Sequence, residues 1–181
     1  DWPARNELSA RKPSADALWV GQARIDGGVV VEDTPRYFRG RFELMAWLRT
    51  ILTEALISGE RVFLGFDFAF GYPVGAAKRI AELPGWDAMW NKISRDVTDD
   101  TTNRTNRFHV ANGWNRDCFG GHGPFWGHPP SAQFEHLPAR KPSAGSHGLP
   151  EKRLVEECVV SAQPVWKLAY TGSVGSQALL G

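Results

Sequence analysis

Apolar residues run almost without interruption through residues 61–73, whose sequence is RVFLGFDFAFGYP. A continuous apolar run of this kind is typical of a strand that is buried on both faces of a sheet. One carboxylate, Asp67, stands inside the run, and burying a charge is costly unless a cation, a donor network or a proton accompanies it. The run therefore predicts a central strand. Asp67 either accepts hydrogen bonds from backbone amides at the strand end or belongs to a metal or catalytic site.

Residues 34–59 show the clearest helical periodicity in the chain. Apolar side chains recur at steps of three and four, namely Phe38, Phe42, Met45, Leu48, Leu52 and Leu56. Thr34 is a suitable N-cap, Pro35 fits the first helical position, and Gly59 suits the C-terminal end. The pattern predicts one long helix that packs its apolar stripe against the core.

The segment before this helix predicts a β-hairpin. Residues 17–25 and 29–32 are rich in strand-forming side chains, and Asp26, Gly27 and Gly28 between them form a turn signal. A buried strand that follows a crossover helix is expected to run parallel to an earlier strand. The order of hairpin, helix and buried strand therefore indicates an α/β fold with a mixed sheet.

The second half of the chain alternates short helical patterns with loops. Helices are predicted over residues 74–83, 86–97, 103–114 and 151–160, a strand over 164–169, and a glycine turn that opens a helix over 172–181. Residues 116–149 are rich in Gly, Pro and His, and we interpret them as a long loop-rich insertion suited to substrate contacts. We interpret residues 1–181 as a single domain.

Composition narrows the class of protein. The 181 residues are 42% hydrophobic and include eight Trp and ten Phe, enough for a sizeable core. The 21 basic and 20 acidic side chains nearly cancel, so net charge gives no case for a nucleic-acid or membrane partner. The spacing of Cys118 and Cys158 matches neither a zinc site nor a disulfide framework, and no apolar run reaches the ~20 residues of a membrane span. We expect a cytoplasmic protein with reduced cysteines and no membrane association.

The two ends of the chain also affect the expected sheet. The chain starts at Asp1 and stops at Gly181 directly after an apolar run. We therefore expect further strands on both sides, so that the sheet is truncated at each end.

Asp1 and Asp67 form the first candidate site. If Asp1 ends a preceding strand, both carboxylates lie at the ends of neighbouring central strands, an arrangement that holds Mg²⁺ or Mn²⁺ through oxygen ligands. A third ligand is expected from Glu156, with Glu157, Asp99 and Asp100 as alternatives. Each of these four acids taken singly is better explained as part of a solvated helix face or a helix-end cap.

Two further groups have phosphate-binding chemistry. Gly172, Ser173, Gly175 and Ser176 lie in a turn whose backbone amides can form an anion nest before a helix, although an ordinary turn explains them equally well. Asn106 and Arg107, with Asn103 and Arg104 before them, combine amides with guanidinium groups. Helix capping, or salt bridges to Asp99 and Asp100, are equally good explanations for this second group.

Nucleophilic hydrolysis and zinc binding are disfavoured. His122 and His128 flank a Gly-Pro-Phe-Trp-Gly segment without a third ligand at zinc-like spacing, and loop histidines are the simpler interpretation. The sequence also contains no GxSxG motif and no credible Cys-His pair.

Several motifs taken together resemble one bacterial family. They are DW at 1–2, ADALWVGQA at 15–23, GFDFAFGYP at 65–73, NRF at 106–108, FWGHP at 125–129, the helix around 153–156 and GSVGSQALLG at 172–181. The set resembles the DUF429 type, predicted nucleases with an RNase H-like fold. The resemblance implies a five-stranded mixed sheet flanked by helices, with the first-strand and central-strand aspartates at Asp1 and Asp67. It also implies a further acid on a strand beyond the last glycine turn.

The sequence therefore predicts a divalent-metal-dependent phosphoesterase or nuclease of RNase H-like type. Asp1, Asp67 and Glu156 would hold Mg²⁺ or Mn²⁺, while Asn106, Arg107 and the turn at 172–177 would contact a nucleic acid or a phosphate-containing small molecule. Two alternatives stay open. One is a non-catalytic module that binds a nucleotide or cofactor-like molecule under the aromatic loop at Phe125 and Trp126, and the other is a phosphotransferase related to actin-like ATPases.

Overall fold

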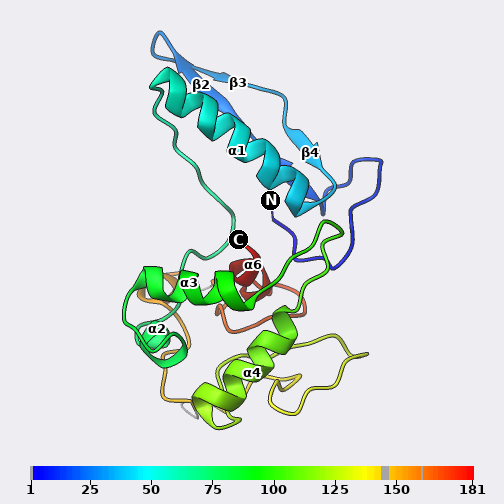
Figure 1. The fold of residues 1–181 in the computed structure, drawn as a ribbon, viewed down its shortest axis with the longest axis vertical. Coiled ribbons are helices and arrows are strands. Elements are labelled where there is room, and N and C mark those ends of the chain that lie inside the picture. Colours follow the sequence, from blue (N-terminus) through cyan, green and yellow to red (C-terminus); the bar gives the residue numbers. More distant parts are fainter. Residues whose placement is uncertain (1, 144–146, 160) are drawn as a thin grey trace. The chain divides into compact units, whose positions relative to one another are not determined.

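The computed structural model describes residues 2–143, 147–159 and 161–181, and they form a mixed α/β protein (Figure 1). The elements in chain order are β1 (Leu18–Val20), β2 (Ala23–Asp26), β3 (Val29–Glu32), β4 (Arg36–Phe38), α1 (Arg41–Ser58), α2 (Ala76–Ile80), α3 (Trp86–Asp96), α4 (Arg107–Phe119), α5 (Leu154–Glu157) and α6 (Gly175–Leu180). The chain divides into two compact units, Asp1–Asp67 with Asp99–Arg104, and Phe68–Thr98 with Thr105–Gly181. No helix in the described part of the chain is long and apolar enough to cross a membrane.

The predicted hairpin is confirmed in the first unit, but the strand expected at 17–25 is divided into β1 and β2, and only β2 belongs to the hairpin. Strands β2 and β3 pair antiparallel, with Asp26 opposite Val29 across a two-residue turn. Gly27 and Gly28 both have positive φ, 55° and 84°, which is the backbone of a type I′ turn. The glycines therefore set the register of the hairpin.

The start of the predicted long helix is wrong. Arg36–Phe38 form β4, which pairs antiparallel with β1, and α1 begins only at Arg41. Strand pairing supplies these residues with hydrogen-bond partners that a first helical turn lacks, so tertiary contacts override the local signal from Thr34 and Pro35. The predicted end is confirmed, because Gly59 adopts the left-handed conformation that closes the helix (φ 71°).

The buried face of α1 also differs from the expected stripe. Arg41, Leu44, Leu48 and Ala55 are buried, whereas Leu56, expected inside, is 81% exposed. The helix packs against β4 of the same unit. Which face turns inward depends on these neighbours, and the weakly amphipathic sequence does not fix it.

The predicted central strand at 61–73 is wrong for the described structure. The segment contains no strand, and Phe63 in its middle is 96% exposed. For residues 61–65, no backbone hydrogen bond to another described residue is found that would make a sheet ladder. A strand exists only where a neighbour supplies this ladder, so apolar side chains alone do not create one. The sheets of the described residues have two strands each, and the expected five-stranded mixed sheet is absent from them.

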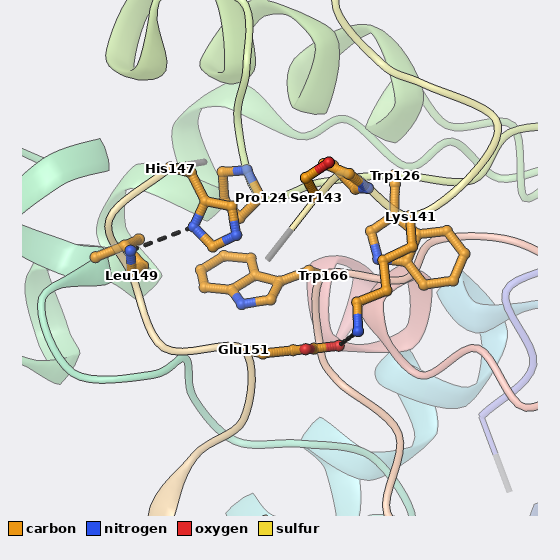
Figure 2. A pocket seen from close by; sticks show the side chains of 9 residues that line it. Pro124, Trp126, Lys141, Ser143, His147, Leu149, Glu151 and Trp166 are labelled. Carbon is orange, nitrogen blue, oxygen red and sulfur yellow. Dashed lines mark hydrogen bonds and ion pairs between the residues drawn. The ribbon is translucent and has the colours of Figure 1, made fainter. Parts of the chain in front are cut away.

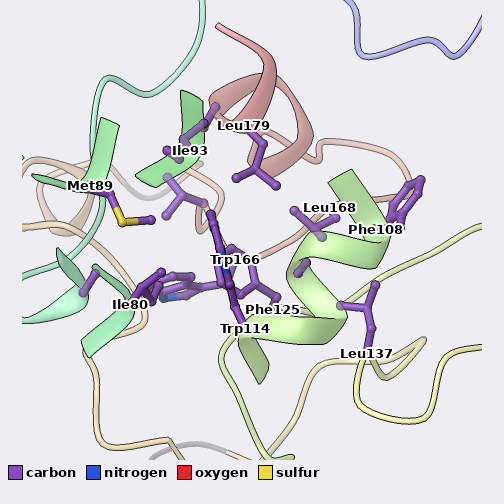
Figure 3. Close-up of a cluster of buried hydrophobic side chains, with 14 of the residues drawn as sticks. Ile80, Met89, Ile93, Phe108, Trp114, Phe125, Leu137, Trp166, Leu168 and Leu179 are labelled. Carbon is purple, nitrogen blue, oxygen red and sulfur yellow. The ribbon is translucent and has the colours of Figure 1, made fainter. Parts of the chain in front are cut away.

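The second unit has an aromatic core (Figure 3). Buried side chains from α2, α3, α4 and α6 meet residues of the loop segments, among them Ile80, Met89, Trp114, Phe125, Leu137, Trp166 and Leu179. The helix predicted at 74–83 shortens to α2, while the helix at 86–97 is confirmed as α3 and the helix after the glycine turn as α6. The helix predicted at 103–114 exists as α4, displaced towards the C-terminus. The helix at 151–160 shortens to α5, and residues 164–169 contribute only one bridge, Lys167 to Trp126.

The loop-rich segment after α4 is held together by one buried amide. Asn115, with 0% exposure, donates from Nδ2 to the carbonyls of Phe125 (2.9 Å) and His136 (2.7 Å). Its Oδ1 accepts from the backbone amide of Phe125 at 3.2 Å. A side chain at Gly123 would collide with this amide, because an added Cβ would lie 1.9 Å from Oδ1. The segment lacks helix and strand across its described residues from Gly120 to Leu149, yet it supplies part of the core.

Candidate functional site

Asp67 lies at the end of the first unit with its side chain exposed to solvent. The residue before it, Phe66, packs edge-on against Trp2, with ring centroids 5.8 Å apart. Trp2 is 3% exposed, so this contact is buried. Asp1, the other predicted metal ligand, lies outside the described residues. The structure therefore brings together the two chain segments that directly adjoin these aspartates.

Arg41 holds the N-terminal segment in place. Its Nε and Nη2 donate to the two carboxylate oxygens of Asp99, at 2.5 and 2.8 Å. Its Nη1 donates to the carbonyls of Pro3 (3.0 Å) and Arg5 (2.9 Å), and Nη2 also donates to the carbonyl of Asn103 (2.9 Å). These bonds use all five N–H groups of a guanidinium that is 1% exposed. A buried cation is thereby fully satisfied, and it ties α1 to the residues that follow Trp2.

Asp99 and Asp100, two of the three acids proposed as alternative third ligands, have structural roles in this unit, whereas Glu157 is exposed in the second unit. Asp99 forms the ion pair with Arg41. Asp100 accepts from the hydroxyl and amide of Thr102 and from the amide of Arg104, closing a tight turn. The Thr102 hydroxyl, followed by the Arg104 amide, lowers the pKa of Asp100 below its usual value. Both carboxylates therefore stabilise the segment at 99–104.

Glu156, the predicted third metal ligand, belongs to the second unit and is engaged there. Its Oε1 accepts from Arg153 Nε and Nη2, at 3.0 and 2.9 Å, and its Oε2 accepts from the Arg153 backbone amide at 2.8 Å. The side chain is buried. Because both oxygens cap α5, the assignment of Glu156 to a metal does not fit this geometry.

Arg107 and Ser176, two of the predicted phosphate contacts, do come together, but they bond to each other. Arg107 Nε donates to Ser176 Oγ at 2.8 Å, and that hydroxyl donates to the carbonyl of Leu168 at 2.6 Å. Arg107 is buried and lies over the ring of Phe108 at 4.4 Å. The buried pair joins α4 to α6, so it links the two helices within the fold.

Asn106 and the glycine turn are also used within the fold. Asn106 accepts from the Thr98 amide (2.8 Å) and donates to the Asp96 carbonyl (2.9 Å), which links the end of α3 to the start of α4. In the turn, the amide of Ser173 donates to Tyr170 and that of Gly175 to Lys167. Gly175 is packed so closely that a Cβ would lie 2.1 Å from the Val165 carbonyl oxygen. Gly172 is exposed and supplies the turn with its positive φ of 75°.

The histidines and other metal-type side chains do not gather into a site. His122 is exposed, whereas His128 is buried and its Nδ1 lies 2.9 Å from the Pro129 carbonyl. Within residues 2–143, 147–159 and 161–181, no cluster of three or more His, Cys, Asp or Glu side chains has the geometry to hold a metal ion.

The second unit contains a cavity of about 190 Å³ (Figure 2). Its walls include Pro124, Trp126, Leu149 and Trp166, and its polar groups come from Lys141, Ser143, His147 and Glu151. Lys141 and Glu151 form an ion pair on one side of Trp166, and His147 lies on the other side. The sequence located substrate contacts in this loop and named Trp126. The sequence did not indicate Lys141, His147, Glu151 or Trp166 as parts of one site, because no motif links these four positions.

The environment of His147 favours the neutral form of its imidazole. Burial lowers the pKa of its imidazole below 6.5, and the nearby Glu151 carboxylate opposes this shift to a smaller extent. Its Nδ1 accepts a hydrogen bond from the Leu149 amide at 3.3 Å. The proton of the neutral ring therefore resides on Nε2, which is left as a donor on the cavity side of the ring.

Comparison with models of known families, with curated proteins and with solved structures finds no match. The fold defines a mixed α/β protein of two small units, and its function has to be argued from its own residues.

Proposed function

We propose that the protein is a divalent-metal-dependent phosphoesterase or nuclease of RNase H-like type, with Asp1 and Asp67 as the metal-binding carboxylates. The observation that carries the proposal is the buried contact between Trp2 and Phe66. Each ring belongs to the residue adjoining one of the two aspartates, so the contact holds the two acid-bearing segments against each other.

The chemistry of the two residues fits Mg²⁺ or Mn²⁺. Both ions prefer carboxylate oxygens and retain water molecules, which requires a ligand that faces solvent. Asp67 is exposed, whereas Asp99 and Glu156 are already engaged by arginines. A bound metal would activate a water molecule and neutralise charge on the reacting phosphate. The chain's own residues would bind and orient that ion, and two hydrogen bonds from Arg41, to the carbonyls of Pro3 and Arg5, position the segment that carries Trp2.

The RNase H-like architecture is part of the proposal. It rests on the resemblance of the GFDFAFGYP motif at 65–73. Among the described residues the sheets have two strands each, and residues 61–73 are not a strand.

The test is a Mn²⁺ titration of the protein, followed by cleavage assays on single-stranded and duplex DNA and RNA in Mg²⁺ or Mn²⁺. We expect metal binding and metal-dependent cleavage, with Asp67→Asn lowering the rate by about 100-fold or more because a charged ligand is lost. Asp16→Asn is the matched control, since the Asp16 side chain is 89% exposed in the same unit. Absence of metal binding, or equal cleavage by wild type and Asp67→Asn, refutes the proposal.

A further inference from the structure

The cavity of the second unit is a preformed site whose aromatic walls are fixed by the backbone. Trp126 donates its amide to the Trp166 carbonyl (3.0 Å), and its own carbonyl accepts from the Leu168 amide (2.8 Å). The Trp166 indole Nε1 donates to the Pro150 carbonyl at 3.0 Å, which sets the orientation of the ring. Because the walls are held in place, a ligand would not have to order them on binding.

The size and lining of the cavity favour a flat molecule. A volume of about 190 Å³ is below the range of roughly 300–1,000 Å³ that is typical for drug-sized ligands. The half-buried indole of Trp126 and the half-buried ring of Pro142 supply apolar surface against which a planar ring can lie, whereas Trp166 and Pro124 line the cavity as fully buried residues. The cavity therefore suits one heterocyclic ring system, with any attached sugar or phosphate outside.

The polar groups at the cavity determine which hydrogen-bond donors and acceptors the edge of such a ring must carry. The Lys141 ammonium is a donor and the Glu151 carboxylate an acceptor, and their ion pair keeps them side by side at the cavity (Figure 2). Their side chains are 49% and 40% exposed, so the pair itself contributes at most about 1 kcal/mol and rearranges at little cost. The neutral His147 adds a donor at Nε2.

We propose that this cavity binds a nucleobase of the guanine type. The edge of guanine presents the O6 acceptor beside two parallel N–H donors, N1–H and N2–H. Lys141 donates to the acceptor, the Glu151 carboxylate accepts from the two donors, and the ring lies against the half-buried Trp126. The site lies wholly within the second unit and requires neither Asp67 nor a metal.

The experiment measures binding of guanosine, adenosine and ribose 5-phosphate to the metal-free protein, by tryptophan fluorescence and by calorimetry. We expect saturable guanosine binding with a Kd below about 1 mM, weaker binding of adenosine and none of ribose 5-phosphate. Lys141→Met and Glu151→Gln should each weaken guanosine binding about tenfold or more, because each removes a charge-assisted hydrogen bond.

Matched controls separate the site from general charge effects. Lys92→Met and Glu157→Gln change the same residue types elsewhere in the second unit, and both should leave guanosine affinity unchanged. Because Lys141 and Glu151 are half-exposed, their variants are expected to fold. No saturable guanosine binding, equal affinity for ribose 5-phosphate, or unchanged affinity in both cavity variants overturns the proposal. None of these outcomes bears on metal-dependent cleavage at Asp67.

Discussion

Replacing Arg41 by methionine tests whether one buried guanidinium holds the N-terminal segment. The change removes the charge and all five donors while keeping most of the apolar volume of the side chain. It leaves the Asp99 carboxylate and three backbone carbonyls, those of Pro3, Arg5 and Asn103, without their present partner. Breaking a buried ion pair by removing one partner costs about 3–5 kcal/mol.

The expected loss lies near the lower end of this range. The Asp99 side chain is 24% exposed, so water can rehydrate its carboxylate once Arg41 is gone. We expect Arg41→Met to lower the free energy of unfolding by about 3 kcal/mol, a large share of the roughly 5–15 kcal/mol typical of folded domains. Arg41→Lys keeps the charge but has three donors in place of five, and an intermediate loss is expected.

Urea unfolding followed by circular dichroism gives the overall change, and amide hydrogen exchange localises it. Exchange should accelerate in residues 2–9, which adjoin the lost carbonyl contacts. Arg116→Met is the control, because the ion pair of Arg116 with Asp117 is exposed to solvent and should contribute little to stability. If both variants lose the same small amount and the N-terminal amides stay protected, Arg41 is not the anchor.

Three further predictions concern the second unit. Asn115→Ala should cost about 3–5 kcal/mol in urea unfolding, because three hydrogen bonds to Phe125 and His136 disappear; a loss below about 1 kcal/mol would contradict this. Burial raises the pKa of the Tyr72 hydroxyl far above its usual value, and the hydroxyl finds no hydrogen-bond partner among the described residues. Tyr72→Phe should therefore leave stability unchanged or raise it by up to about 1 kcal/mol, and a clear thermal destabilisation would show that a partner exists. Burial in the folded state lowers the pKa of His147 below 6.5, so the unfolded chain binds a proton at this imidazole more readily, and the free energy of unfolding should decline as the pH falls through 6.5 and below. His147→Gln should lose this pH dependence, and identical pH profiles of wild type and variant would contradict the prediction.

Local sequence indicated some features of the candidate sites, and packing in the fold decided the others. The sequence paired Asp1 with Asp67, and the contact of Trp2 with Phe66 supports that pairing without testing it. It named Arg107 and Ser176 as phosphate contacts, but in the fold they form a hydrogen bond with each other. The sequence shows that a side chain can donate or accept a hydrogen bond, but it does not show whether the partner is a ligand or a neighbouring residue.

Local chemistry by itself determined the turns and most of the helices. Gly27 and Gly28 impose the hairpin because glycine tolerates two consecutive positive φ angles, and Gly59 ends α1 for the same reason. Pro84 and Gly85 separate α2 from α3. These features depend on dihedral preferences and hydrogen bonds within a few residues, so the sequence carries them almost completely.

Only the tertiary structure decided the features that depend on distant partners. Residues 36–38 are a strand because β1 lies beside them, and residues 61–65 are not a strand because no described neighbour offers a ladder. The cavity combines Trp126, Lys141, Glu151 and Trp166 from separate segments that Asn115 and the Trp126 bridge hold in place. Hydrogen-bond pairing and burial depend on which segments come into contact in the fold. The pattern of apolar and polar residues along the chain does not specify those contacts.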